Sequence, residues 1–243
     1  MDTDAVIMLF AIFAVAVMYS SVGHGGASGY LAVMAFWAVV PEVIRPTALV
    51  LNVFVASIAA VQFWRSGNFS WRLFWPFAAA SIPAAYVGGL IYLPTHIYKI
   101  VLGGVLVIAA VRLAWKLAAD SEIKAPPLGL SLAVGAVIGL LSGMVGVGGG
   151  IFLTPVLLLM GWSETRTAAG VSAMFILVNS IAGLVAQYDK LGSLPSAAWM
   201  WVAAAVAGGV IGSTLGGRRF DSLTMRRVLA CVLVFAGIKL VFV

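Results

Sequence analysis

Two glycine-rich segments contain the residues of this chain whose types and spacing best suit the binding of a small charged molecule. Residues 21–29 read Ser-Val-Gly-His-Gly-Gly-Ala-Ser-Gly, and residues 142–150 read Ser-Gly-Met-Val-Gly-Val-Gly-Gly-Gly. Each glycine inside a helix costs about 1 kcal/mol relative to alanine, so both segments are predicted to interrupt helices. Backbone N–H groups at such breaks, with the N-terminal ends of helices starting near Ala27 and Ile151, indicate an anion site. The competing interpretation is close helix packing, which small residues permit.

A few polar side chains could complete such a site. His24 lies inside the first glycine segment, where an imidazole is a candidate proton carrier or anion contact. The alternative is a histidine bonded to a neighbouring carbonyl, since Val147 takes its place in the second segment. Asn52 and Asn179 are candidates for lining a polar cavity, and hydrogen bonding between helices explains them equally well. The predicted substrate-binding residues are Ser21, Gly23, His24, Gly25, Gly26, Ser28, Asn52, Gly146, Gly148, Gly149, Gly150 and Asn179.

The elements that must position these residues are membrane helices. The chain has 243 residues, of which 63% are hydrophobic and 9% are charged, whereas a soluble domain has about 25% charged residues. The fold class is therefore an all-α integral membrane protein. Apolar segments are expected near residues 5–21, 27–40, 46–64, 73–93, 97–117, 128–142, 151–162, 167–187, 197–217 and 225–243. Those beside the glycines are shorter than the roughly 20 residues of a full span.

The chain is predicted to be an internal duplication with a period of about 125 residues. Gly23 corresponds to Gly146, Gln62 to Gln187, and Gly88 to Gly212. The first repeat covers residues 1–125 and the second covers residues 126–243, within one membrane domain. Each repeat is expected to contain a glycine-broken helical hairpin and three transmembrane helices. Glycine-interrupted apolar segments at matching places in two halves are typical of transporter binding sites.

The basic residues predict how the two repeats are oriented. If each glycine hairpin returns the chain to its starting side, ten basic residues emerge on one side and four on the other. If each hairpin is one broken span, the division is seven against seven. The positive-inside rule favours the first arrangement, in which the repeats are inverted and both termini lie outside the inner membrane, in the periplasm. The ten are Arg65, Arg72, Arg112, Lys116, Lys124, Arg166, Arg218, Arg219, Arg226 and Arg227, and the four are Arg45, Lys99, Lys190 and Lys239.

Several classes of function are disfavoured by the residues present. All eight acidic residues fall in expected tails or loops, although buried carboxylates are usual in membrane cation sites and proton relays. No nucleotide, haem, zinc or hydrolase signature occurs, so we expect no cofactor, no bound metal and no enzymatic activity. The single cysteine, Cys231, excludes an intrachain disulfide. The net charge of +6 is explained by cytoplasmic loops, and nucleic acid is not expected as a partner.

The segment from Gly146 to Pro155, read with Glu164–Gly170 and Asn179, resembles the TauE/SafE family of sulfite exporters and sulfonate permeases. The likeness rests on a Gly-x-Gly-Gly-Gly run followed by a proline in a duplicated chain of this length. In the first half, Ala27 replaces the third glycine and Ala32 stands in place of the proline. The resemblance implies transport of a small sulfur-containing or organic anion, such as sulfite, sulfoacetate or another sulfonate.

The leading hypothesis is thus a secondary anion transporter whose site lies where the two glycine segments meet. The alternative is a non-transporting membrane assembly or scaffold protein whose glycines serve helix packing alone. The expected partners are a small anionic substrate and the lipid bilayer. A coupling ion, either a proton or sodium, and a homodimer are left open by the sequence.

Overall fold

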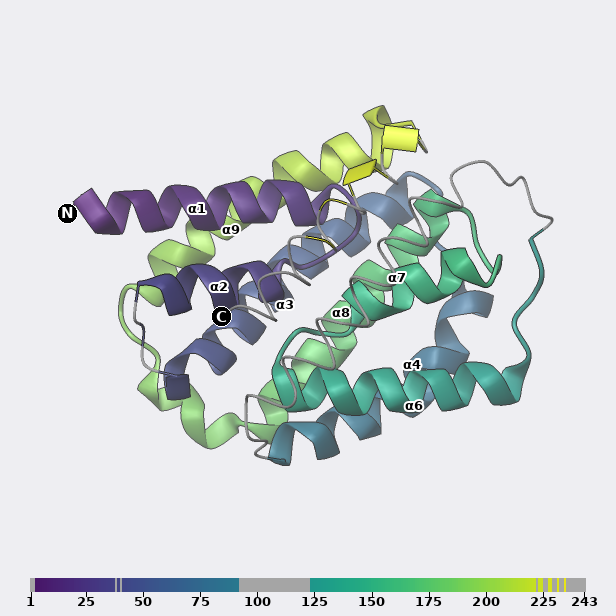
Figure 1. Cartoon of the computed structure of the whole chain (residues 1–243), viewed down its shortest axis with the longest axis horizontal. Coiled ribbons are helices and arrows are strands. Elements are labelled where there is room, and N and C mark those ends of the chain that lie inside the picture. Colours follow the sequence, from purple (N-terminus) through teal and green to yellow (C-terminus); the bar gives the residue numbers. More distant parts are fainter. Residues whose placement is uncertain are drawn as a thin grey trace.

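The computed structural model describes residues 3–37, 39, 41–91, 123–221, 223–224, 227–228, 231 and 234. Every regular element in these ranges is helical, which confirms the predicted all-α class. Figure 1 shows the helices as an elongated bundle with the first helix at one end. The expected helix over residues 97–117 lies outside the described residues, as does most of the one over residues 225–243.

Six of the described helices are long and apolar enough to cross a membrane. A bilayer core of about 30 Å requires roughly 20 residues at 1.5 Å each. The chain is thus a multi-pass membrane protein in which the long helices set the frame. The six spans are α1 (Thr3–Ser20), α3 (Pro41–Arg65), α4 (Trp71–Leu90), α6 (Leu128–Val145), α8 (Thr165–Ala186) and α9 (Ala198–Thr214) together with η2 (Leu215–Arg219), which continues it. The short helix η1 (Tyr188–Ser193) precedes α9.

Two short helices follow the glycine segments, as the sequence predicts. These are α2 (Ala27–Phe36) and α7 (Gly150–Leu159), of ten residues each. At 1.5 Å per residue, each covers about 15 Å, which is half of the bilayer core. In Figure 1, α1 and α2 form a hairpin that opens toward the N-terminal end of the molecule, and α6 and α7 form one that opens toward the opposite end. Both glycine turns therefore point toward the middle of the bundle.

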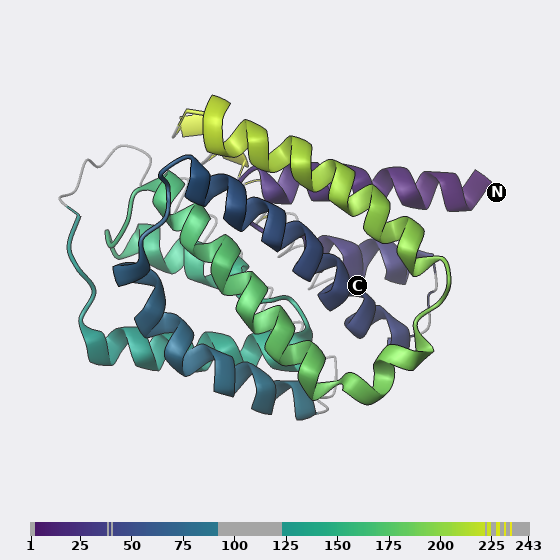
Figure 2. The ribbon, with the colours of Figure 1, turned by 180° about the vertical axis from the view of Figure 1, so that it is seen from behind.

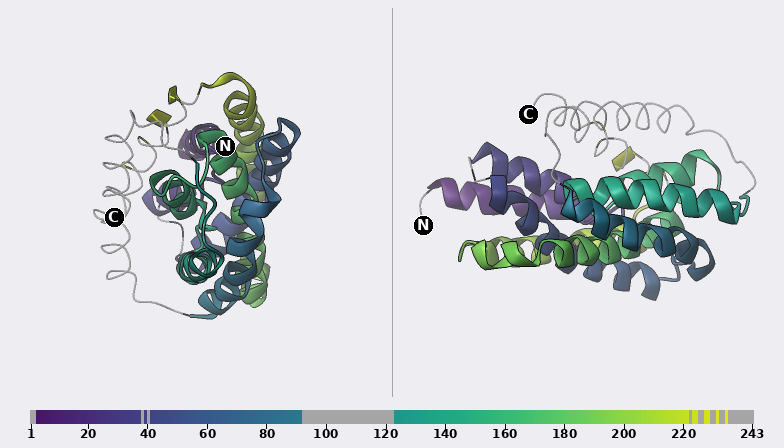
Figure 3. Two further views of the ribbon diagram at one scale, coloured as in Figure 1. Left: turned by 90° about the vertical axis from the view of Figure 1, so that its right-hand side faces the viewer. Right: turned by 90° about the horizontal axis from the view of Figure 1, so that it is seen from below.

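The described helices form two layers. In Figure 2, one layer runs in the order α9, α3, α8 and α4. Behind it, the two hairpins form the second layer, as the end-on view in Figure 3 shows. The first hairpin packs through α1 on α9, and the second packs through α6 on α4. Each hairpin is therefore held by a helix at the edge of the other layer.

Two series of glycines bring these helix pairs into backbone contact. A Cβ atom added at any of them would lie 1.8–2.4 Å from a carbonyl oxygen of the facing helix or turn, so only glycine permits the observed spacing. The packing interpretation of glycine is thus correct for these positions. On α6 they are Gly135, Gly139 and Gly143, and on α9 and the turn after it they are Gly208, Gly212 and Gly216.

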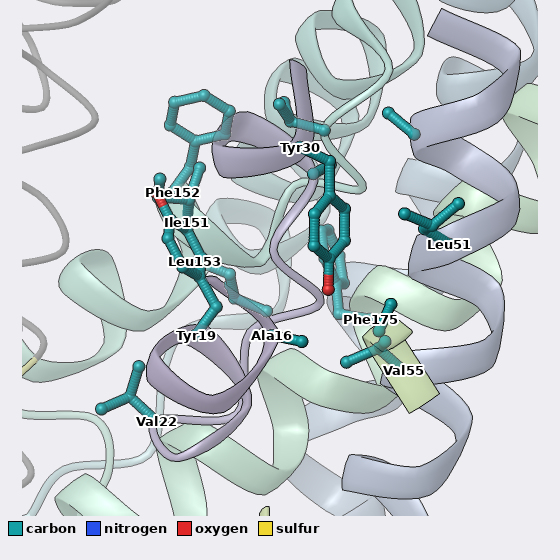
Figure 4. Close-up of a cluster of buried hydrophobic side chains, with 14 of the residues drawn as sticks. Ala16, Tyr19, Val22, Tyr30, Leu51, Val55, Ile151, Phe152, Leu153 and Phe175 are labelled. Atoms are coloured by element: carbon teal, nitrogen blue, oxygen red, sulfur yellow. The ribbon is translucent and has the colours of Figure 1, made fainter. Parts of the chain in front are cut away.

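The main apolar core lies where the two hairpins meet the first layer. It combines side chains from α1, α2, α3, α7 and α8, which are distant in sequence. In the close-up of Figure 4, Tyr19 and Tyr30 of the first hairpin lie in one cluster with Leu153 of the second and with Phe175 of α8. This core holds the two glycine turns in fixed positions relative to each other.

Two boundaries differ from the sequence-based expectation. An apolar segment is predicted from residue 46, but α3 begins at Pro41 and includes Arg45. Pro46 lies in the second turn of α3, where it removes only one backbone hydrogen bond. The helix expected from near Ile151 begins one residue earlier, at Gly150, so Pro155 lies in the second turn of α7. Arg45 is therefore part of a membrane helix and not of a loop.

Candidate functional site

The two glycine turns are buried and adopt backbone conformations that favour glycine. Residues 20–30 and 146–155 are buried almost without interruption. Left-handed φ angles of +73° to +92° occur at Gly23, Gly26, Gly146, Gly148 and Gly149. Other residues rarely adopt such angles, so the glycines are required for the chain to reverse within the protein. Each turn leads directly into the N-terminus of a short helix, where backbone N–H groups lack helical partners.

Asn52 of α3 contacts both turns. Its Oδ1 accepts a hydrogen bond of 3.0 Å from the backbone N–H of Ala27, the first residue of α2. A Cβ atom added to Gly25 would lie 2.3 Å from that Oδ1, and one added to Gly148 would lie 2.9 Å from Nδ2 of the same side chain. Nδ2 also donates to Oγ of Ser180 over 3.4 Å. One amide thus joins a turn of the first half to a turn and a helix of the second.

The second turn lies against α8 and the end of α6. A Cβ atom on Gly148 would meet Ile176 and Ser180 at 2.7 and 2.8 Å, and one on Gly149 would meet Phe175 at 2.9 Å. Farther along α7, Thr154 donates a hydrogen bond of 2.6 Å to Ser172 of α8. The turn is therefore surrounded by hydroxyl groups and aliphatic carbon, with backbone amides at its centre.

Four buried polar atoms around the turns have no hydrogen-bond partner in the described part of the chain. They are Nε2 of His24, the hydroxyl oxygens of Tyr30 and Ser142, and Oδ1 of Asn179. Each of these side chains is at most 1% exposed. Leaving a buried polar group unpaired costs about 1–3 kcal/mol, so these atoms are available to a bound molecule.

His24 and Asn179 are each partly engaged. Nδ1 of His24 donates to the carbonyl of Val22 over 3.1 Å, as the structural alternative for this residue predicts, while Nε2 stays available. Asn179 donates through Nδ2 to the carbonyl of Phe175 over 2.8 Å, within its own helix. Both side chains therefore combine a structural contact with one unused polar atom.

Four of the predicted site residues have contacts away from Asn52. Ser28 donates to the hydroxyl of Tyr19 over 3.0 Å, and Ser21 bonds the carbonyl of Met18. Gly23 lies against the backbone of Ala169, where an added Cβ would be 2.1 Å from the carbonyl oxygen, and Gly146 lies against the side chain of Arg45. These residues shape the turns, whereas Gly25, Gly148 and Asn52 form their meeting point.

Sequence reasoning missed the cation beside the second turn. The guanidinium of Arg45 donates to the carbonyls of Gly88 and Gly89, each over 3.4 Å, and to that of Gly143. These carbonyls belong to the last turns of α4 and α6, where the helix dipole is negative. Arg45 therefore stabilises the two helix ends that support the second turn. This role was not predicted from the sequence, because an arginine directly before a proline is typical of a loop.

The electrostatic character of the region otherwise follows the sequence. The described acidic residues lie at helix ends or in connections: Asp4, Glu42, Glu164, Asp189 and Asp221. No carboxylate of the described chain therefore competes for the donors at the turns. Gln187, directly after α8, is buried at 2% exposure and donates to the carbonyl of Gly183 over 3.3 Å. The helix preceding it packs on α3 and α4, which covers this end.

Comparisons with known proteins identify relatives over the whole chain. The sequence model of a family described as "Sulfite exporter TauE/SafE" matches residues 8–240. A "Probable membrane transporter protein y4hK" of Sinorhizobium fredii is 40% identical over 247 residues and covers both chains completely. A "Probable membrane transporter protein YunE" of Bacillus subtilis is 27% identical over 116 residues, which are 46% of this chain and 41% of that protein. No solved structure matches the chain significantly.

Proposed function

Because the chain belongs to the TauE/SafE family of sulfite exporters, we propose that it is a secondary transporter of a small sulfur-containing or organic anion. Sulfite, sulfoacetate and other sulfonates are the substrates that the family suggests, and the inner membrane is the proposed location. The relatives named as membrane transporters and the six membrane-length helices support this proposal.

The proposed substrate site lies between the two glycine turns. The observation that carries it is the position of Asn52, which contacts Gly25 of one turn and Gly148 of the other. Both short helices start at this place, so their N-terminal N–H groups supply positive potential without a fixed charge. Ser142 supplies a hydroxyl donor that has no other described partner. Nε2 of neutral His24 and Oδ1 of Asn179 are acceptors, so they contact a protonated ligand oxygen or a bridging water, and Nε2 becomes a donor when His24 is protonated. The guanidinium of Arg45 beside the second turn is engaged by the carbonyls of Gly88, Gly89 and Gly143, so the turns themselves present backbone dipoles, and this suits release of an anion as well as binding.

The proposed substrate class is tested by a binding screen on the purified protein. A ligand that binds only the folded state raises the melting temperature in proportion to the logarithm of its concentration above Kd. We expect sulfite or a sulfonate to raise it, and a carboxylate of similar size to raise it less. Flux of the same anion into liposomes then separates a transporter from a scaffold protein. A protein that binds no anion and carries none would contradict the proposal.

The proposed arrangement of the two halves is an inverted repeat, with residues 1–125 and 126–243 as its units. The two hairpins open toward opposite ends of the bundle in Figure 1. The packing contacts also follow this pattern. In the first half α1 packs on α9 of the second half, and α6, the counterpart of α1, packs on α4, the counterpart of α9. Two such units would present their glycine turns to each other near the membrane midplane, as in other transporters built from inverted repeats.

The positive-inside rule predicts that the N-terminus faces the periplasm. Arg65 ends α3, Lys124 precedes α6, and Arg166 begins α8, and these ends lie together at the end opposite the start of α1. In a Cys231→Ser background, a membrane-impermeant maleimide should label Thr3→Cys from the periplasm and Ile123→Cys only after the membrane is opened. Both positions are suitable, because Thr3 and Ile123 are exposed. Labelling of both from one side would contradict the inverted arrangement.

His24 is the proposed route for any proton coupling that involves the protein. His24→Gln keeps a hydrogen-bonding side chain but cannot titrate near neutral pH. We expect the pH dependence of transport to become flatter, with a loss of substrate affinity of less than about tenfold, since one hydrogen bond contributes roughly 1 kcal/mol. The measurement is liposome flux between pH 5 and 8. An unchanged profile would assign His24 a structural role. The sequence leaves sodium coupling and a homodimer open.

A further inference from the structure

A groove of about 510 Å³ opens between α3 and α9, away from the glycine turns. These two helices lie side by side in Figure 2. Arg65 lies thirteen residues beyond Asn52 on α3, which corresponds to about 20 Å along the helix. The groove therefore shares no residue with the proposed substrate site. Its lining residues are Ser57, Ile58, Val61, Gln62, Arg65, Thr214 and Arg218.

The polar end of the groove is built to bind an oxyanion. Arg65 and Arg218 both line the groove, and neither guanidinium group has a hydrogen bond or ion pair with another described residue. The hydroxyl of Thr214 has two acceptors within reach, the carbonyl of Val210 at 2.6 Å and Oε1 of Gln62 at 3.1 Å. The amide N–H groups of Gln62 bond no other described side chain and are additional donors. No acidic residue of the described ranges lines the groove. Guanidinium groups in this setting favour phosphate, because they bind its oxygens through paired hydrogen bonds.

The other end of the groove is apolar and continues along the outer surface of α3. Phe54, Ile58, Val61 and Arg65 follow helical spacing and so lie on one face. Phe54 and Val61 are 40% and 42% exposed, which suits contact with lipid chains. Trp64 is also largely exposed, as expected of an aromatic side chain at the level of the lipid headgroups. The surface thus changes from cationic to apolar in the direction of the membrane core.

From this combination we propose that the groove binds an anionic phospholipid. The phosphate is held by Arg65 and Arg218, the headgroup hydroxyls meet Gln62, and one acyl chain lies along Val61, Ile58 and Phe54. Basic pockets between membrane helices on the cytoplasmic side are suited to anionic headgroups. A free anion would use the two arginines but would gain nothing from the apolar stripe. The lipid is therefore the occupant that matches both ends of the groove.

The test compares lipids that differ only in charge. Delipidated full-length protein in detergent is titrated with phosphatidylglycerol and with phosphatidylcholine of the same acyl chains, and binding is followed by native mass spectrometry. We expect a preference for phosphatidylglycerol that falls roughly 25-fold in the double variant Arg65→Gln/Arg218→Gln, at roughly fivefold for each basic residue. Each single variant should lose about fivefold, which keeps the test usable if the double variant folds poorly.

Arg219→Gln is the matched control, because Arg219 is an exposed neighbour of Arg218 that does not line the groove. It should keep the preference. A double variant with an undiminished preference, or a control with an equal loss, would overturn the proposal. Displacement of the lipid by millimolar inorganic phosphate or sulfite would show a site for free anions instead. Transport is not part of the readout, so the lipid site and the proposed substrate site are tested separately.

Discussion

Gly148→Val is expected to reduce transport by about 100-fold or more while the protein still inserts into the membrane. The backbone at Gly148 has a φ of +73°, and an added Cβ would lie 2.7–2.9 Å from Ile176, Ser180 and Asn52. The valine must therefore displace the turn from Asn52, at the centre of the proposed site. A displacement of about 1 Å in a binding site can cost on the order of 100-fold in rate. The measurement is anion flux into liposomes reconstituted with equal amounts of protein.

Gly67→Val separates backbone strain from the effect on the site. Gly67 has a nearly identical φ of +75°, but no atom lies within 4 Å of an added Cβ. This variant should therefore lose stability through strain, of about 1–2 kcal/mol, and keep most of its flux. Normal flux in Gly148→Val would refute the proposed site. An equal loss of flux in both variants would assign the effect to strain, and the glycines of the turn would then be needed for folding alone.

Asn52→Leu should lower both stability and transport. Leucine has a similar volume but leaves the buried N–H of Ala27 without its acceptor at 3.0 Å, which costs about 1–3 kcal/mol. It also removes the amide that contacts Gly148. We expect the melting temperature to fall by about 2–4 °C for each kcal/mol lost and flux to fall at least tenfold. Both are measured on the same purified protein, in detergent and in liposomes.

Asn179→Leu is the matched comparison, because Asn179 bonds only a carbonyl of its own helix and its Oδ1 has no described partner. Its removal should therefore cost less stability than that of Asn52. Oδ1 accepts hydrogen bonds, so if it contacts a protonated ligand oxygen or a water that bridges to the anion, flux should fall nonetheless. A variant with normal flux and normal anion binding would remove Asn179 from the proposed site. Equal destabilisation by both substitutions would contradict the specific role assigned to the Asn52–Ala27 hydrogen bond.

Much of the architecture could be predicted from properties that are local in the chain. Hydropathy predicted the membrane-helical class, because apolar segments of about 20 residues match the thickness of the hydrocarbon core of a bilayer. The glycine segments predicted the breaks before α2 and α7, because several adjacent glycines oppose a continuous helix wherever it packs. The placement of the described carboxylates at helix ends was predictable for the same reason, since a charge is costly at membrane depth.

Which residues meet was decided only by the tertiary structure. Asn52 is 96 residues from Gly148 and 128 from Ser180, yet the packing of α3 on α8 brings all three together. No local pattern predicts which helices pack together. The sequence also does not distinguish a glycine at a contact between helices from a glycine in a turn. Arg45 was missed for a related reason. Its role depends on the ends of α4 and α6 lying beside α3, and that proximity exists only once the helices have assembled.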